Sequence, residues 1–169
     1  MMQLDDDTLD FARRVFQYAR TGETAPLADL LAQGLPANLR NERGDSLLML
    51  ACYHGHLETA RVLLEHGADP ELLNDAGQTP LAGAAFKGDA AVAALLLERG
   101  AVVDAAGPNG KTALTIAAMF NRVEMMRQLI GHGADPRSVD AAGMPIREAA
   151  AKMGAVEAVD FLNQLLEPR

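Results

Sequence analysis

The chain has 169 residues and a net charge of −8 at neutral pH, and apolar side chains make up 49% of it. An acidic surface of this kind does not attract nucleic acid or an anionic membrane, so we expect neither as a partner. The single cysteine cannot form an internal disulfide, the N-terminus lacks the pattern of a signal peptide, and no apolar stretch is long enough to span a membrane. These features predict a cytoplasmic protein.

A repeat with one constant interval runs along the chain. Three columns of identical residues recur at this interval: Gly44, Gly77, Gly110 and Gly143; Ala51, Ala84, Ala117 and Ala150; and Gly34, Gly67, Gly100 and Gly133. Three columns in one register are very improbable by chance, and a period of this length is typical of stacked helical repeats.

The first unit, residues 8–40, keeps only part of the pattern and is expected to cap the stack. Its first helix carries apolar side chains on one face, which suits a unit with a single neighbour. These side chains are Leu9, Ala12, Val15, Phe16 and Ala19. Acidic residues gather where the helix begins, at Asp5, Asp6, Asp7 and Asp10, and there they complement the helix dipole.

Each central unit predicts two helices joined by a tight turn and followed by a longer one. The three full units are expected at 41–73, 74–106 and 107–139. In the second of them, Thr79 suits the N-cap and Pro80 the first helical position, where its missing N–H is harmless. Gly88 and Gly100 then suit left-handed positions that end the two helices. In the third unit Asn121 takes the place of the turn glycine, and asparagine also tolerates a left-handed backbone.

The last unit, residues 140–169, is expected to be a second cap. Arg147 stands where the full units have Leu48, Leu81 and Leu114, and Asn163 where they have Leu64, Leu97 and Ile130. A repeat without a successor should become polar on its outer side, as these two replacements indicate.

The repeats resemble the ankyrin-repeat family. The family's run of glycine, Thr-Pro-Leu-His, paired alanines and a closing Leu-Leu-x-x-Gly-Ala-Asp is largely present in "GDSLLMLACYHGHLETARVLLEHGAD" from Gly44, "GQTPLAGAAFKGDAAVAALLLERGAV" from Gly77 and "GKTALTIAAMFNRVEMMRQLIGHGAD" from Gly110. The resemblance covers about residues 9–167 and is that of a small, bacterial-looking member. It implies one all-α domain, residues 1–169, a solenoid of helix–turn–helix units with β-hairpin-like connecting turns and about five repeats including caps. The family histidine is replaced, by Met49, Ala82, Thr115 and Glu148.

Residues with catalytic or metal-binding chemistry do not assemble into a recognisable motif. Cys52, His54 and His56 superficially resemble a metal cluster, but Cys52 shares its column with inward-facing alanines and the two histidines should point elsewhere. Ser46 and Ser138 lie in no nucleophile elbow, and the chain has no phosphate-binding loop. We therefore expect no metal, no cofactor and no enzymatic activity.

A binding surface remains as the functional candidate. The resemblance implies that a concave face, built from the inner helices and the turn tips, binds other proteins. Two columns should point into it: Tyr53, Phe86, Met119 and Lys152, and beside them His54, Lys87, Phe120 and Met153. Aromatic residues and methionine are enriched at interface centres. An alternative is that these side chains only seal the grooves between helices.

Turn residues should form a charged rim around this face, although they could equally be ordinary solvated loop residues. They are Arg40, Glu42, Arg43, Asp45, Leu73, Asp75, Gln78, Asn109 and Lys111. The sequence thus predicts a monomeric scaffold that binds another protein through Tyr53, His54, Phe86, Lys87, Met119 and Phe120 and through this rim. The alternative function is a small-molecule or metal-dependent enzyme that uses the concave face.

Overall fold

The computed structural model describes residues 5–168, and within this range it contains ten helices and no strand. The helices are α1 (Asp6–Thr21), α2 (Thr24–Ala32), α3 (Leu47–Tyr53), α4 (Leu57–Glu65), α5 (Pro80–Lys87), α6 (Ala90–Glu98), α7 (Ala113–Met119), α8 (Val123–Gly131), α9 (Ile146–Lys152) and α10 (Val156–Leu166). Isolated antiparallel bridges, Arg40 with Ser46 and Val139 with Pro145, close two hairpin-like turns. The predicted all-α fold with hairpin-like connections is confirmed.

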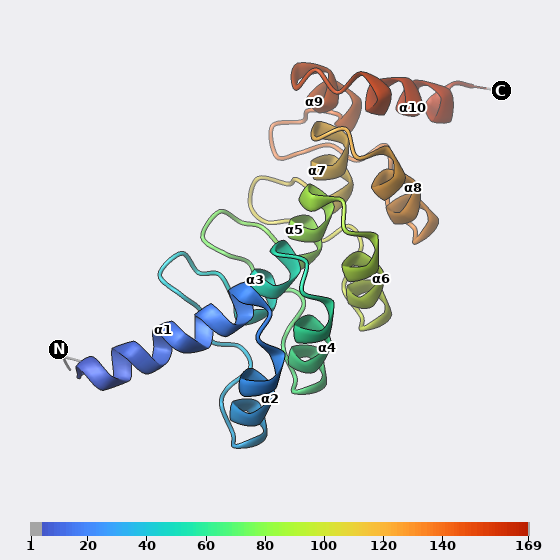
Figure 1. Cartoon of the computed structure of the whole chain (residues 1–169). Coiled ribbons are helices and arrows are strands. Elements are labelled where there is room, and N and C mark those ends of the chain that lie inside the picture. Colours follow the sequence, from blue (N-terminus) through green and yellow to red (C-terminus); the bar gives the residue numbers. More distant parts are fainter. Residues whose placement is uncertain (1–4, 169) are drawn as a thin grey trace.

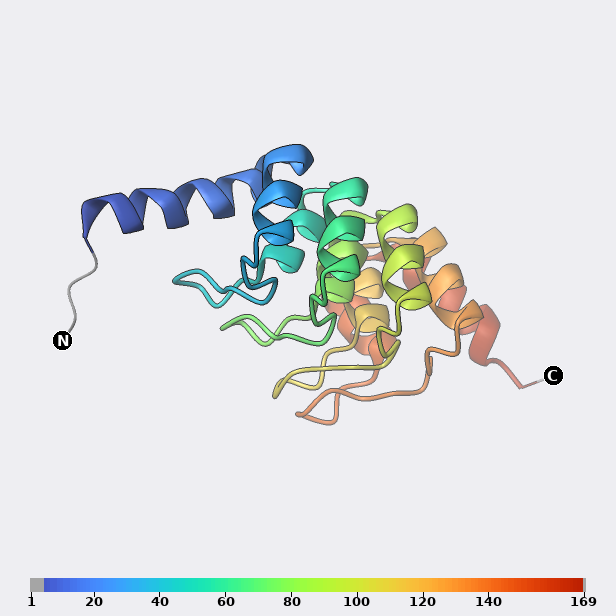
Figure 2. The same ribbon diagram turned by 90° about the horizontal axis from the view of Figure 1, so that it is seen from below.

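The helices form two rows (Figure 1). The odd-numbered helices, called the inner row here, pack one on the next from α1 to α9, and each even-numbered helix packs on the inner helix before it. The hairpins that connect the units project from the inner row on one side (Figures 1 and 2). Each unit therefore contacts its neighbours only, as in other repeat solenoids.

Side-chain caps and left-handed residues set the helix ends as the sequence predicts. The N-cap side chains of three inner helices each accept a hydrogen bond from the backbone N–H three residues on: Ser46 from Met49 (2.9 Å), Thr79 from Ala82 (3.1 Å) and Thr112 from Thr115 (3.2 Å). Pro80 occupies the first position of α5, and Gly88 ends it with φ of 73°. Asn121 has φ of 59° and is the one non-glycine among the described residues with a positive φ.

The core lies between the rows and is aliphatic. Leu48, Leu81 and Leu114 are at most 2% exposed, and full burial of such a side chain contributes about 1.5–3 kcal/mol. The alanine column Ala51, Ala84 and Ala117 is fully buried. Because alanine is small, it lets successive inner helices approach closely.

The two ends of the stack differ from its middle. Helix α1 has 16 residues and extends beyond the stack (Figure 2), whereas the other inner helices have 7 or 8. In α9, Arg147 is exposed, as predicted for a cap. Ala151 is exposed too, although Cys52 and Ala85 in its column are buried, because no further repeat packs on α9 within residues 5–168. Asn163 stays half-buried.

Candidate interaction groove

Side chains brace the hairpins that precede the inner helices. In the first two hairpins, Asn41 and Asn74 each accept hydrogen bonds from two backbone N–H groups further along the turn, at 2.9 to 3.1 Å. Asp140 does the same in the last hairpin, whereas Gly107 holds this position in the third. Such side-chain-to-backbone bonds fix a turn locally.

The first two hairpins are also bonded to each other. The backbone N–H of Asp75 donates to the carbonyl of Arg43 at 3.0 Å, and the side-chain amide of Asn74 donates to the carboxylate of Asp45 at 2.9 Å. Together with the braces inside each turn, these bonds join the two hairpins into one wall.

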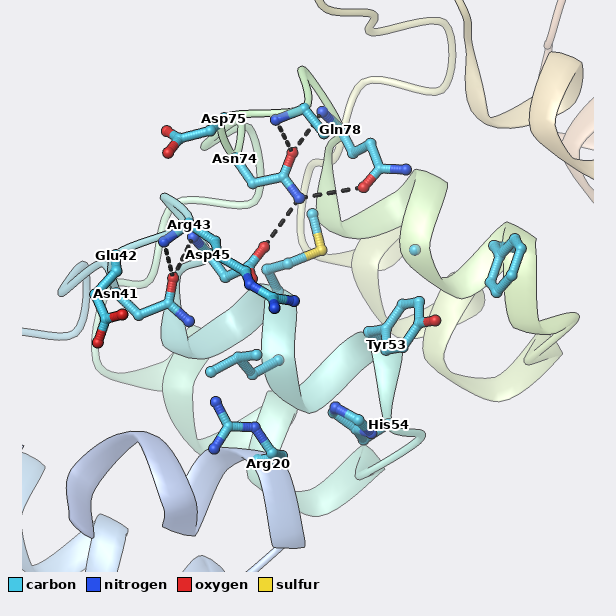
Figure 3. A pocket seen from close by; sticks show the side chains of 15 residues that line it. Arg20, Asn41, Glu42, Arg43, Asp45, Tyr53, His54, Asn74, Asp75 and Gln78 are labelled. Atoms are coloured by element: carbon cyan, nitrogen blue, oxygen red, sulfur yellow. Dashed lines mark hydrogen bonds between the residues drawn. The ribbon is translucent and has the colours of Figure 1, made fainter. Parts of the chain in front are cut away.

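A groove of about 910 Å³ lies between this wall and the inner helices (Figure 3). It is lined by Arg20, Asn41, Glu42, Arg43, Asp45, Met49, Leu50, Tyr53, His54, Asn74, Asp75, Ala76, Gln78, Gly83 and Phe86. Figure 3 shows the labelled hairpin residues along one side and Arg20 and His54 on the other. The groove therefore has a polar hairpin wall opposite the ends of α1 and α3.

Gly83 in the middle of α5 leaves space in the groove lining. Glycine at such a position is about 1 kcal/mol less favourable than alanine in a helix. A Cβ atom here would lie 3.2 Å from the Sδ of Met49 and 3.8 Å from the Cβ of Tyr53. The missing side chain thus makes room for Met49 and keeps this part of the groove open.

Aromatic side chains form a continuous row next to the groove. The rings of Tyr53 and Phe86 stack with centroids 5.8 Å apart and planes 10° apart. The ring of Phe120 meets Phe86 edge-on at 4.6 Å, and His54 meets Tyr53 edge-on at 5.2 Å. Offset-stacked and edge-to-face pairs of this kind are favourable arrangements of aromatic rings. We call Tyr53, His54, Phe86 and Phe120 the aromatic row.

The aromatic row differs in one respect from the column that the sequence predicts, which continues from Tyr53 and Phe86 to Met119. The ring after Phe86 is Phe120, from the adjacent column, and Met119 is half-buried at the end of α7. Phe86 is also half-buried. Its ring lies between those of Tyr53 and Phe120, and these neighbours cover part of its surface.

Positive charge lies beside the aromatic row. The Nζ of Lys87 is 4.6 Å from the centroid of the Tyr53 ring, within the range of a cation–π contact. The pKa of His54 is lowered from its ordinary value, first by partial burial and then by the electrostatic effect of His56, Arg20 and Lys87. The neutral form of His54 is therefore favoured relative to that of a free histidine.

The structure brings eight of the predicted site residues together in the groove lining: Glu42, Arg43, Asp45, Tyr53, His54, Asp75, Gln78 and Phe86. Lys87 and Phe120 extend this surface through their contacts with the rings. Arg40 instead bonds to the hairpins, since its Nε donates to the Gly44 carbonyl at 3.1 Å and its Nη2 to the Leu73 carbonyl.

Of the remaining predicted residues, Leu73 lies on the second hairpin, and Asn109 and Lys111 lie on the third. Asn109 accepts a hydrogen bond from the backbone N–H of Lys111 at 3.0 Å. Both residues lie outside the groove lining.

Sequence reasoning missed several lining residues, and Arg20 is the most informative of them. Arg20 stands one repeat interval before Tyr53 and is thus the first member of the column that contains Tyr53 and Phe86. Asn41 and Asn74 are separated by the same interval. The repeat signal could therefore have identified all three, had the columns been extended into the first unit.

Cys52, His54 and His56, at the end of α3 and just after it, lie in different surroundings. Cys52 is fully buried, and this burial raises the pKa of its thiol. The Nε2 of His56 lies 2.9 Å from the carbonyl oxygen of Arg20. Within residues 5–168, no three His, Cys, Asp or Glu side chains gather as metal ligands would. None of the described helices is long and apolar enough to cross a membrane.

Stacked helix pairs, connecting hairpins and an open groove beside the inner row define an α-helical repeat solenoid. The chain belongs to the ankyrin-repeat family, because the family model for ankyrin repeats (3 copies) matches residues 15–107 and 102–167. A protein of Pseudomonas aeruginosa named "putative ankyrin repeat protein" is 55% identical over 60 residues. The match covers 36% of this chain and 35% of that relative. Ankyrin repeats are in general protein-interaction modules.

Proposed function

We propose that this protein is a non-catalytic scaffold that binds another protein through the groove and the aromatic row. The observation that carries the proposal is the row itself, because Tyr53, Phe86 and Phe120 form a continuous apolar surface beside an open groove. Aromatic side chains at the centre of a surface, with polar residues around them, are typical of protein interfaces. The protein acts as a monomer in this proposal, and its location is cytoplasmic.

The predicted rim supplies the polar surroundings. Arg43, Asp75 and Gln78 lie on the bonded hairpin wall, so their backbone is held before a partner arrives. A surface that is ordered in advance loses less conformational entropy on binding. Arg40, Leu73, Asn109, Lys111 and Met119 belong to the proposed surface at its edges.

The test is capture of partners from a lysate of the source organism with three baits: the wild-type chain, Phe86→Ala and Met153→Ala. Met153 occupies the Phe120 column in the last unit, is 50% exposed, and lies outside the groove lining. A protein held by the wild-type and Met153→Ala baits but lost with Phe86→Ala supports the proposal. Equal capture by all three baits would place the binding surface elsewhere.

A further inference from the structure

The first helix projects from the stack. Helix α1 has 16 residues where the other inner helices have 7 or 8, and its N-terminal turns extend beyond them (Figure 2). The first buried side chain of α1 is Val15. We call residues 6–14 the projecting half. A helical segment of this length without tertiary contacts is only marginally stable in water, so a packing partner would stabilise it.

The projecting half keeps the apolar face of a packed helix. Val15 marks the side of α1 that faces the core, and the helical period places the small side chains of Thr8 and Ala12 on the same side. Leu9 and Phe11 flank them, and these two large apolar side chains are 36% and 39% exposed. The apolar face of α1 therefore continues past the point where the stack ends.

The charges beside this face change sign at the centre of the projecting half. Asp6 and Asp7 precede Leu9, and two arginines follow it seven residues after these aspartates. Seven residues are about two helical turns, so Asp6 and Arg13 share one flank of the apolar face. Asp7 and Arg14 share the other flank for the same reason. Among residues 5–168, Asp6, Asp7 and Arg14 take part in no ion pair. The helix dipole explains the acids at the start of α1, but not the two arginines in its middle.

A surface with this charge order is complementary to a second copy of itself in the antiparallel orientation. A twofold axis between two antiparallel helices brings the same flank of both helices together, and it sets each residue opposite the one equally far beyond the axis. An axis midway between residues 10 and 11 places Asp7 of each copy opposite Arg14 of the other, and Asp6 within one residue of the same register with Arg13. The stacks, which begin at residue 15, then lie at opposite ends of the pair, about 13 Å apart along the helix axis. A parallel pair would instead set acids against acids.

We propose that the projecting half of α1 is a homodimer interface, occupied by the same segment of a second copy in antiparallel orientation. The interface spans about two helical turns per copy, which is less than a standard interface, so pairing is weak and reversible. Of the groove lining only Arg20 belongs to α1, and Arg20 lies outside the projecting half, so each copy keeps its groove. The proposal goes beyond the proposed function: the monomer is the binding unit there, and the dimer presents two such units.

The test is sedimentation equilibrium of the full chain from about 10 µM to about 1 mM, the range in which weak complexes form. We expect an equilibrium between monomer and dimer. Asp7→Arg and Arg14→Asp should each raise the dissociation constant of the dimer about tenfold, because each sets like charges against each other at two symmetric contacts. Phe11→Ser should raise it as well. Glu98→Arg is the matched control, because Glu98 is exposed on α6 and makes the same change in net charge as Asp7→Arg. It should leave the equilibrium unchanged.

A mixture of the two charge variants separates repulsion at the interface from damage to the helix. The Asp7→Arg chain is basic at both positions and the Arg14→Asp chain is acidic at both, so an equimolar mixture should form a heterodimer although each variant alone pairs poorly. A mixture that pairs no better than the separate variants overturns the proposal. A wild-type chain that stays monomeric up to about 1 mM also overturns it, as does a dimer that neither charge variant weakens, since the two copies then meet elsewhere.

Discussion

The N-terminal and C-terminal halves of the inner row share one repeat but present different surfaces. The first two hairpins are bonded through Asp75 and Arg43, and the last two in the same way through Ala141 and Asn109 at 2.9 Å. Between these pairs, Pro108 occupies the donor position and has no N–H to give. The groove forms at the first pair, where two asparagine-braced hairpins face Tyr53 and Phe86.

Units that share the same repeat pattern in sequence and the same backbone therefore present different side chains on their surfaces. In the last unit the columns of Tyr53 and His54 hold Lys152 and Met153, both exposed. These side chains belong to a helix that closes the stack. The groove thus belongs to the N-terminal half, and Phe120 continues the aromatic row into the C-terminal half.

Removal of residues 141–169 should have the largest effect on the stability and the solubility of the chain. Helix α7 packs on α9, and Leu114 and Ala117 on α7 are fully buried. Without α9 these apolar columns meet solvent, so the truncated chain should aggregate or self-associate. Light scattering measures this, and a monomeric truncation of unchanged stability would show that the last unit is not a cap.

Phe86→Ala should lower the free energy of unfolding by about 2 kcal/mol. A fully buried phenylalanine loses about 3–5 kcal/mol on this change, and Phe86 is half-buried between two rings. Met153→Ala, at a position 50% exposed, should lose about 0.5 kcal/mol or less. Urea denaturation compares the two. Similar losses would mean that the two halves do not differ in how these side chains pack.

Gly100→Val should lower stability by about 1–2 kcal/mol, because a branched Cβ strains a left-handed backbone. Gly100 has φ of 91°, and no atom lies within 4 Å of the position of an added Cβ, so only the backbone resists the change. Gly67 and Gly133 have φ of 87° and 94° and equally open surroundings. Valine at any of these three glycine positions should therefore lower stability by a similar amount in both halves. Chemical denaturation measures this, and one valine variant with unchanged stability would contradict a shared backbone role of the three glycines.

The smallest effect should be a pH dependence of stability that arises from His54 in the N-terminal half. Partial burial is the main cause that lowers the pKa of His54, and His56, Arg20 from α1 and Lys87 from α5 lower it further. The folded protein therefore binds this proton less readily than the unfolded chain, and stability is lost as the pH falls from 7 through the ordinary histidine range. His54→Asn should lose less stability than the wild-type chain between pH 7 and pH 5 in urea titrations. Identical pH profiles would show that the pKa of His54 is not lowered in the folded protein.

The sequence by itself determined the backbone of the molecule. Thr79, Gly88 and Asn121 take the cap and left-handed conformations that their residue types favour, because such preferences act over a few residues. The leucine and alanine columns became the core because each unit must bury one face on the next. These signals are local and recur in every unit, so they can be read from one chain.

Only the tertiary structure decided which side chains meet between units. Phe86 pairs with Phe120 from the adjacent column, Arg20 joins the groove from an incomplete first unit, and Gly83 makes room for Met49. Each of these contacts depends on the offset between stacked helices and on side-chain rotamers. The spacing along the sequence fixes neither quantity, because side chains in the same or in adjacent columns of the repeat can face one another or turn away with the same backbone.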